Sequence, residues 1–189
     1  MDLVEFNAAP ADRLRSELVS CCDVPRWVEG ILAKRPYGDR PALTAVADQL
    51  ARELDDNEVD RALQAHPRIG DRPQGAGTEA AWSRKEQSGV GDDPEVRAAL
   101  AEGNREYEDR FGRVFLICAT GLTAAQMLSS LQDRLTHDDA VEAVVVHEEL
   151  RKIALLRLNK LVIVSERSER TKGAASFAHD GAERSEEEA

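Results

Sequence analysis

The chain has 189 residues, a length that fits one domain with room for a tail. Its formal net charge of -11 argues against a nucleic-acid partner, because phosphate binding needs a clustered basic face. A small anionic substrate stays possible, since the local field of a pocket can oppose the global charge. Aromatic residues make up only 4% of the chain, and this favours helix packing over a sheet.

The three cysteines, Cys21, Cys22 and Cys118, show no CxxC spacing, so a zinc ribbon or finger is not indicated. We expect reduced and mostly buried thiols in a reducing compartment. The N-terminus lacks a basic segment followed by an apolar run, and no apolar stretch approaches the roughly 20 residues of a membrane span. These features predict a cytoplasmic protein that has no membrane partner.

Apolar residues recur at helical spacing along most of the chain. Prolines and capping residues mark where several of these segments begin and end. The predicted helices span about 9–22, 26–35, 41–54, 57–65, 94–111, 124–135 and 139–161, with Thr123 and Asp138 or Asp139 as caps of the last two.

Three other segments break this pattern. Residues 70–80 are rich in Gly, Pro and Asp and predict a loop, and Ser83 to Gln87 predicts a helical turn stopped by Gly89 and Gly91. The apolar run from 114 to 119 is too short to decide between a strand and a buried irregular segment. From 166 onward the apolar pattern stops, so we expect an all-α single-domain bundle over 1–165 and a disordered acidic tail over 166–189.

Two clusters carry side chains suited to acid–base chemistry. His66 precedes Pro67, which places the histidine where a helix breaks, and Ser83-x-x-Glu86-Gln87 follows about twenty residues later. Each residue alone has a plain structural explanation, a helix-terminal histidine and a solvated or capping glutamate. Together they can move protons on a small polar molecule without a metal or cofactor.

Other motifs are weaker. His147-Glu148 lies on a predicted helix, but Arg151 stands where the HExxH zinc pattern needs a histidine. Gly75-x-Gly77 follows no strand and is only a fragment of a dinucleotide fingerprint. We therefore expect no cofactor and no metal.

Four runs in order, HPRIGD, SRKEQSGVG, NREYEDRFG and FLICA, resemble the 2-oxo-4-hydroxy-4-carboxy-5-ureidoimidazoline (OHCU) decarboxylases of urate breakdown. Two flanking elements, WVEGILAKRPY and RKIALLRL, fit the same family, and the resemblance covers roughly 6–161. It implies an all-helical fold, no cofactor, a homodimer, and decarboxylation of OHCU to (S)-allantoin. It also implies His66 as proton donor and Glu86 as its partner carboxylate. Matched to substrate-contacting stretches are Pro67, Ser83, Arg84, Lys85, Glu86, Gln87, Phe115, Leu116, Ile117, Cys118 and Ala119.

One departure from the family concerns Thr120, which stands where some members have an arginine. If that arginine binds the substrate carboxylate, this chain needs another cation, for which Arg68 is a candidate. Whether Glu86 orients the imidazole or accepts the proton of the substrate hydroxyl is not decided by the sequence. The alternative from another class is a catalytically silent helical interaction domain whose acidic tail binds a partner.

Overall fold

The computed structural model describes residues 1–64, 66–71, 78–91 and 93–163, and within these ranges the regular structure is helical, with no strand. The predicted all-α fold is confirmed for this part of the chain, while the predicted tail lies outside the described residues. The elements are α1 (Leu3–Ala8), α2 (Ala11–Cys21), α3 (Pro25–Ala33), α4 (Arg40–Arg52), α5 (Asp56–Leu63), α6 (Thr78–Glu86), the 3₁₀ turn η1 (Ser88–Val90), α7 (Pro94–Phe111), α8 (Ala124–Arg134) and α9 (Asp139–Leu161).

Side-chain caps fix the starts of several helices where the sequence predicts them. Thr123 accepts a hydrogen bond from the Gln126 amide, and Gln126 bonds back to Thr123, so α8 begins with a capping box. Asp138 caps α9 in the same position. Helix α7 starts at Pro94 and ends at Gly112, whose φ of 65° is the left-handed conformation that favours glycine.

Two elements differ from the prediction. Helix α1 has six residues, capped by Asp2, and buries only Phe6, so it is too short to produce a periodic apolar pattern. Helix α6 begins at Thr78, and the predicted loop over 70–80 is therefore too long at its C-terminal end. The predicted turn at Ser83 is the end of this longer helix rather than a separate element.

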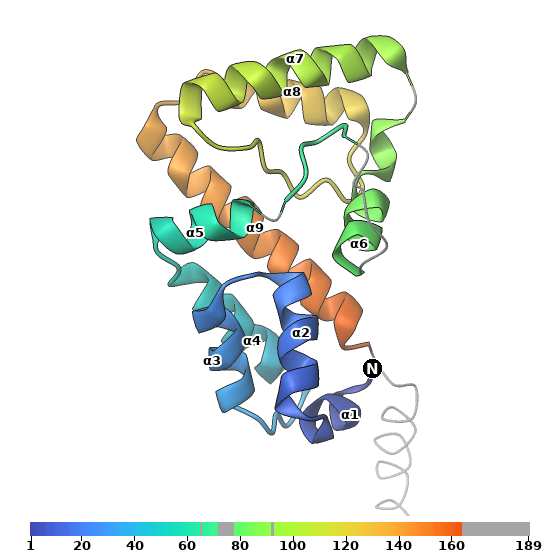
Figure 1. Cartoon of the computed structure of the whole chain (residues 1–189), viewed down its shortest axis with the longest axis vertical. Helices are drawn as coiled ribbons and strands as arrows, with labels where there is room; N and C mark the ends of the chain where they lie inside the picture. The colour runs from blue at the N-terminus through green and yellow to red at the C-terminus, as the bar shows by residue number, and fades with distance from the viewer. Residues whose placement is uncertain (65, 72–77, 92, 164–189) are drawn as a thin grey trace, which may run out of the picture.

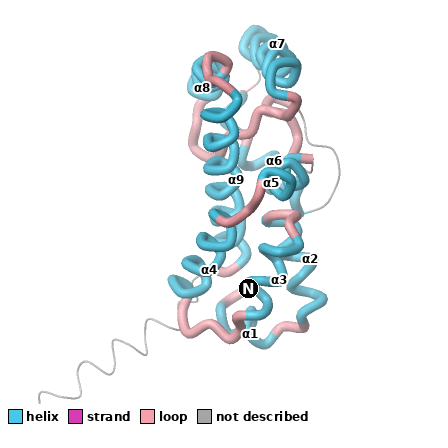
Figure 2. Tube along the Cα trace, turned by 90° about the vertical axis from the view of Figure 1, so that its left-hand side faces the viewer, coloured by secondary structure: helices cyan, strands magenta, loops and turns pink. Residues whose placement is uncertain are grey.

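Helix α9 crosses the molecule obliquely in Figure 1 and reaches from the end with α7 and α8 to the end with α1 and α2 (Figures 1 and 2). Helices α1–α4 lie at one end and α7 and α8 at the other, with α5 and α6 between them. The α-amino group of Met1 donates to the Leu161 carbonyl oxygen at 3.0 Å, which joins the first residue to the end of α9. None of the described helices is long and apolar enough to cross a membrane.

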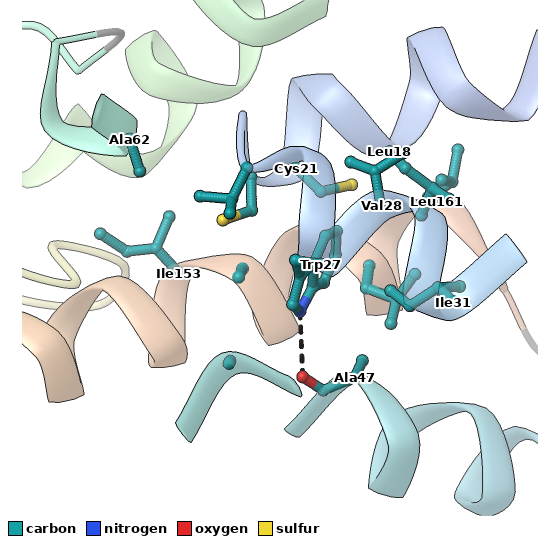
Figure 3. Packing of buried hydrophobic residues seen from close by; sticks show 14 of the residues in the cluster. Leu18, Cys21, Trp27, Val28, Ile31, Ala47, Ala62, Ile153 and Leu161 are labelled. Atoms are coloured by element: carbon teal, nitrogen blue, oxygen red, sulfur yellow. Dashed lines mark hydrogen bonds between the residues drawn. The ribbon is translucent and has the colours of Figure 1, made fainter. Parts of the chain in front are cut away.

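The buried apolar residues form two clusters. The first joins α1–α5 to α9 around Trp27, whose indole N–H donates to the Ala47 carbonyl oxygen at 2.9 Å (Figure 3). The second lies between α7, α8 and the segments that precede them, around Leu100, Tyr107 and Met127.

The apolar run at 114–119 is an irregular segment, not a strand. Phe115 and Ile117 belong to the second cluster and Leu116 to the first. This alternation is what an extended segment between two cores requires, because successive side chains point to opposite sides. The run therefore contributes side chains to both clusters and lies between them.

Candidate active site

His66 lies just beyond the last turn of α5, as its position before Pro67 predicts. Its backbone N–H donates to the Leu63 carbonyl oxygen at 2.9 Å, and its ring Nδ1 lies 2.9 Å from the Ala62 carbonyl oxygen. A carbonyl can only accept, so Nδ1 carries the hydrogen and Nε2 holds a free lone pair in the neutral ring. Nε2 is buried and has no hydrogen-bond partner among the described residues.

The environment keeps this imidazole neutral. Burial and, to a smaller extent, the nearby Arg157 guanidinium lower the pKa of His66 from 6.5 to about 4, and they outweigh the Ala62 hydrogen bond and the Glu86 carboxylate, which raise it. At neutral pH the ligand-free protein therefore presents an unprotonated Nε2. A group in this state can take a proton from a ligand that binds beside it and return the proton later.

Glu86, the last residue of α6, is a buried carboxylate held by two cations. Arg157 contacts it twice, with Nε 3.2 Å from Oε1 and Nη2 2.9 Å from Oε2, and Lys160 Nζ lies 2.9 Å from Oε1. Burial by itself raises the pKa of Glu86, but the hydrogen bonds and charges of Arg157 and Lys160 outweigh it and lower the pKa. The carboxylate is therefore ionised, and it acts on His66 through space.

Arg157 is the central cation of the site, and the sequence reading did not single it out. Only 2% of this residue is exposed, and its guanidinium also donates to Ser83 Oγ at 3.1 Å and to the Ser20 carbonyl oxygen at 3.3 Å. The sequence does contain a signal for Arg157, which is its position in the helical pattern. Arg157 lies at helical spacing on the buried face of α9 together with Leu150, Ile153, Ala154, Leu158 and Leu161.

A charged residue on an apolar stripe needs a buried partner, and Glu86 is that partner. Two positive charges, on Arg157 and Lys160, face one negative charge on Glu86. The group therefore carries an excess of positive charge, although the chain as a whole is acidic. Arg68, the candidate cation suggested by Thr120, is held instead by Glu108, with Nη2 2.6 Å from Oε2.

The other predicted residues of the 83–87 stretch divide into two kinds. Ser83 is buried and bonded to the Arg157 guanidinium, whereas Arg84 and Lys85 are exposed. Gln87 contacts the chain after His66: it accepts from the Gly70 amide at 3.0 Å and donates to the Arg68 carbonyl oxygen at 3.4 Å. Pro67, half-buried, is the link between His66 and this clamped segment.

In the segment from 115 to 119, Phe115, Leu116, Ile117 and Ala119 are buried and Cys118 is half-buried. The Cys118 backbone N–H donates to the Glu149 carboxylate at 2.7 Å, so it is not free for a ligand in this state. Burial raises the pKa of the Cys118 thiol, with Glu149 and Glu86 adding to the effect, which places Cys118 within electrostatic reach of the site. Substrate contact by this segment stays a prediction.

A buried polar cluster supports the same segment from the far side. Arg134 donates to the Leu116 carbonyl oxygen at 2.6 Å, and its Nε lies 2.8 Å from Glu142 Oε1. Tyr107 donates its hydroxyl to Glu142, and the Arg134 guanidinium lies 4.7 Å from the centre of the Phe115 ring. Helices α7, α8 and α9 thus hold this segment in place through buried groups that are paired with one another.

Among the described residues, no three His, Cys, Asp or Glu side chains are placed to hold a metal ion. The arrangement brings together a histidine, a carboxylate and two cations within an all-helical scaffold. Fold and arrangement together define a helical protein whose buried polar groups include an unpartnered imidazole nitrogen beside an ion pair.

The OHCU decarboxylase family model matches residues 7–159 of this chain. The chain belongs to the OHCU decarboxylase family. It is 31% identical over 145 residues to the uric acid degradation bifunctional protein TTL of Arabidopsis thaliana, covering 75% of this chain and 45% of that protein. It is 30% identical over 141 residues to the 2-oxo-4-hydroxy-4-carboxy-5-ureidoimidazoline decarboxylase of Amia calva, covering 73% and 81% of the two chains.

A solved structure described as OHCU decarboxylase in the presence of (S)-allantoin has the same fold. The TM-score is 0.67 at 28% sequence identity, covering 77% of this chain and 96% of the other. The chain spans less than half the length of the bifunctional Arabidopsis protein, so only that part of the relative is comparable.

Proposed function

We propose that this protein decarboxylates OHCU to (S)-allantoin by cofactor-free acid–base catalysis. The observation that carries the proposal is the buried, unpartnered Nε2 of His66 beside the Glu86–Arg157 ion pair. This combination matches the chemistry that a decarboxylation requires, and the family membership supports it.

The charge of the site suits the substrate. OHCU enters as a carboxylate, and the group formed by Arg157, Lys160 and Glu86 has a positive excess that attracts an anion. Once bound, the substrate carboxylate raises the pKa of the adjacent His66, since a nearby negative charge favours the imidazolium. Binding therefore prepares the proton donor, which is neutral before the substrate arrives.

The reaction then needs one bond to break and one to form. The bond from the ring carbon to the carboxylate breaks, carbon dioxide leaves, and the electron pair remains on the ring system. His66 Nε2–H donates its proton to carbon on one face only, which gives a single enantiomer. Solvent returns one proton to Nε2, so the substrate anion and one proton yield allantoin and carbon dioxide.

The ion pairs of Glu86 favour a third role, beside the two that the sequence leaves open. Two bound cations lower the pKa of this carboxylate, and a weak base is poorly suited to deprotonate a hydroxyl. We therefore propose that Glu86 fixes the Arg157 guanidinium and balances its charge beside His66. Pro67, Ser83 to Gln87 and Phe115 to Ala119 are proposed to surround the substrate, with exposed Arg84 and Lys85 near its entrance.

We also propose a cytoplasmic homodimer, as the family resemblance implies. Light scattering coupled to size-exclusion chromatography should give twice the 20.8 kDa mass of one chain. A single-chain mass at concentrations well above those of the activity assay would contradict this.

The test of the function is to mix the protein with freshly generated OHCU and follow the chirality of allantoin by circular dichroism. The proposal predicts rapid formation of the (S) enantiomer. Racemic allantoin at the rate of the spontaneous reaction would instead support the alternative, a silent helical interaction domain.

A further inference from the structure

We infer that Asn104 is a positioning residue for His66, acting through the backbone of the segment between them. The inference rests on the proposed function, in which His66 delivers the proton. On one side His66 is held by the carbonyl oxygens of Ala62 and Leu63 on α5, and on the other side Pro67 leads into an irregular segment rather than into another helix.

Residues 68–70 are held by two side chains of α7 and by Gln87, which follows α6. Asn104 Nδ2 on α7 donates to the Ile69 carbonyl oxygen at 2.8 Å, and Arg97 Nη2 on the same helix donates to the Gly70 carbonyl oxygen at 2.9 Å. Gln87, just after α6, binds the backbone of Arg68 and Gly70. These three residues lie outside any helix, and four of their backbone polar groups are thus held by side chains from other parts of the chain.

The central contact of this clamp is the one made by Asn104. Only 2% of Asn104 is exposed, and Ile69, whose carbonyl it binds, is 5% exposed, so neither group can turn to water instead. Asparagine is a poor residue for the middle of a helix, and its Oδ1 is buried with no partner among the described residues. An apolar residue at this position would avoid the low helix propensity and the unpaired Oδ1, but it would leave the Ile69 carbonyl oxygen without a donor. The N–H group of the Asn104 amide is therefore the part that has a role here.

The connection from Ile69 to His66 is short and stiff. Pro67 has a fixed φ, and it restricts the backbone of His66 directly before it. On the other side, the ring of His66 reaches the Ala62 carbonyl oxygen at 2.9 Å only while its backbone stays where it is. If the hydrogen bond to Ile69 is removed, the backbone between Ile69 and His66 should shift. The His66 ring would then lose its hydrogen bond to the Ala62 carbonyl oxygen, and with it the preference for one tautomer.

The test uses two variants and one control on the same helix. Asn104→Leu keeps a similar side-chain size and removes the donor, and Asn104→Ala removes the side chain beyond Cβ. Arg105→Ala is the control, because Arg105 is exposed and its Nε bonds to the Ala101 carbonyl oxygen within α7. Thermal melting by circular dichroism first establishes that each variant is folded.

Two readouts separate this inference from the proposed function. Steady-state turnover of OHCU should show kcat lowered about 10- to 100-fold in both Asn104 variants, with KM within about threefold of wild type, as for a misplaced catalytic group. Nitrogen-15 NMR of the His66 ring, assigned with His66→Asn, should show a proton fixed on Nδ1 in wild type and an averaged tautomer in the variants. The NMR readout needs no turnover, so it stands even if wild type fails to act on OHCU.

Unchanged kcat and unchanged ring signals in both variants would overturn the inference. Loss of kcat with the His66 signals intact would also overturn it, since Asn104 would then act by another route. Unfolding of both variants would make Asn104 a residue of the core only. A wild-type protein that shows the fixed tautomer but no turnover would refute the proposed function and leave the positioning role in place.

Discussion

Acidification from about pH 7.5 to about pH 5 should reduce the free energy of unfolding through His66 alone by about 2 kcal/mol. The folded protein holds this imidazole with a pKa of about 4, below its ordinary value of 6.5, because burial and Arg157 disfavour the charged form. Between these two values the unfolded chain binds a proton that the folded protein does not. Stability is therefore fully present above the unfolded pKa and declines as the pH falls toward the folded one.

The full effect follows from the two pKa values. Each pH unit between them is worth about 1.4 kcal/mol, so the difference between 6.5 and about 4 amounts to about 3 kcal/mol, of which about 2 kcal/mol is lost by pH 5. Stopping at pH 5 avoids most of the titration of carboxylates such as Glu86, whose pKa is lowered. Their contribution would otherwise mix with that of His66.

The assay is urea unfolding followed by far-UV circular dichroism at the two pH values, for wild type and for His66→Asn. Every other group titrates alike in both proteins, so the difference between them reports His66. The variant should lose about 2 kcal/mol less than wild type over this range. Equal losses in the two proteins would refute the burial of an unprotonated imidazole, and with it the electrostatic account of the site.

Three further predictions concern the carboxylate, metal dependence and the end of the domain. Glu86→Gln should lower turnover on OHCU, and it should also lower the melting temperature because Arg157 loses its buried counter-charge. Adding Arg157→Met should restore much of the stability but none of the activity, and a double variant with wild-type turnover would contradict the assignment. Dialysis against a strong chelator should leave turnover unchanged, and a loss that a divalent ion reverses would oppose this. Truncation after Ser165 should preserve the melting temperature, whereas truncation after Arg151 removes the buried end of α9 and should cause aggregation, so identical behaviour of the two would place the domain boundary elsewhere.

Much of the fold could be predicted from local sequence signals. Pro94 and Gly112 bound α7, and Thr123 and Asp138 cap α8 and α9, because caps and helix breakers act within a few residues. Elements that depend on distant contacts could not be predicted in this way. Helix α1 is too short to show a repeating apolar pattern. The run at 114–119 is irregular because it packs between two clusters of residues that are far apart in the sequence.

The candidate site divides in a similar way. His66 and Glu86 can be proposed from the sequence because they lie in motifs that resemble the OHCU decarboxylase family, and the membership of this family is confirmed. Their roles stay a prediction. Arg157 and Asn104 were not found, because each contacts residues far away in the chain: Arg157 binds Glu86 and Asn104 binds Ile69. A charge or an amide at a buried position of a helix was the available signal, but the partner comes only from the three-dimensional arrangement.

The central claim is that His66 supplies the proton that completes the decarboxylation of OHCU. The most direct measurement compares wild type with His66→Asn on freshly generated OHCU, following both the rate and the enantiomer of allantoin by circular dichroism. The account predicts (S)-allantoin from wild type and a rate about 10²- to 10⁴-fold lower in the folded variant. A variant within about threefold of the wild-type rate that still yields the (S) enantiomer would contradict it.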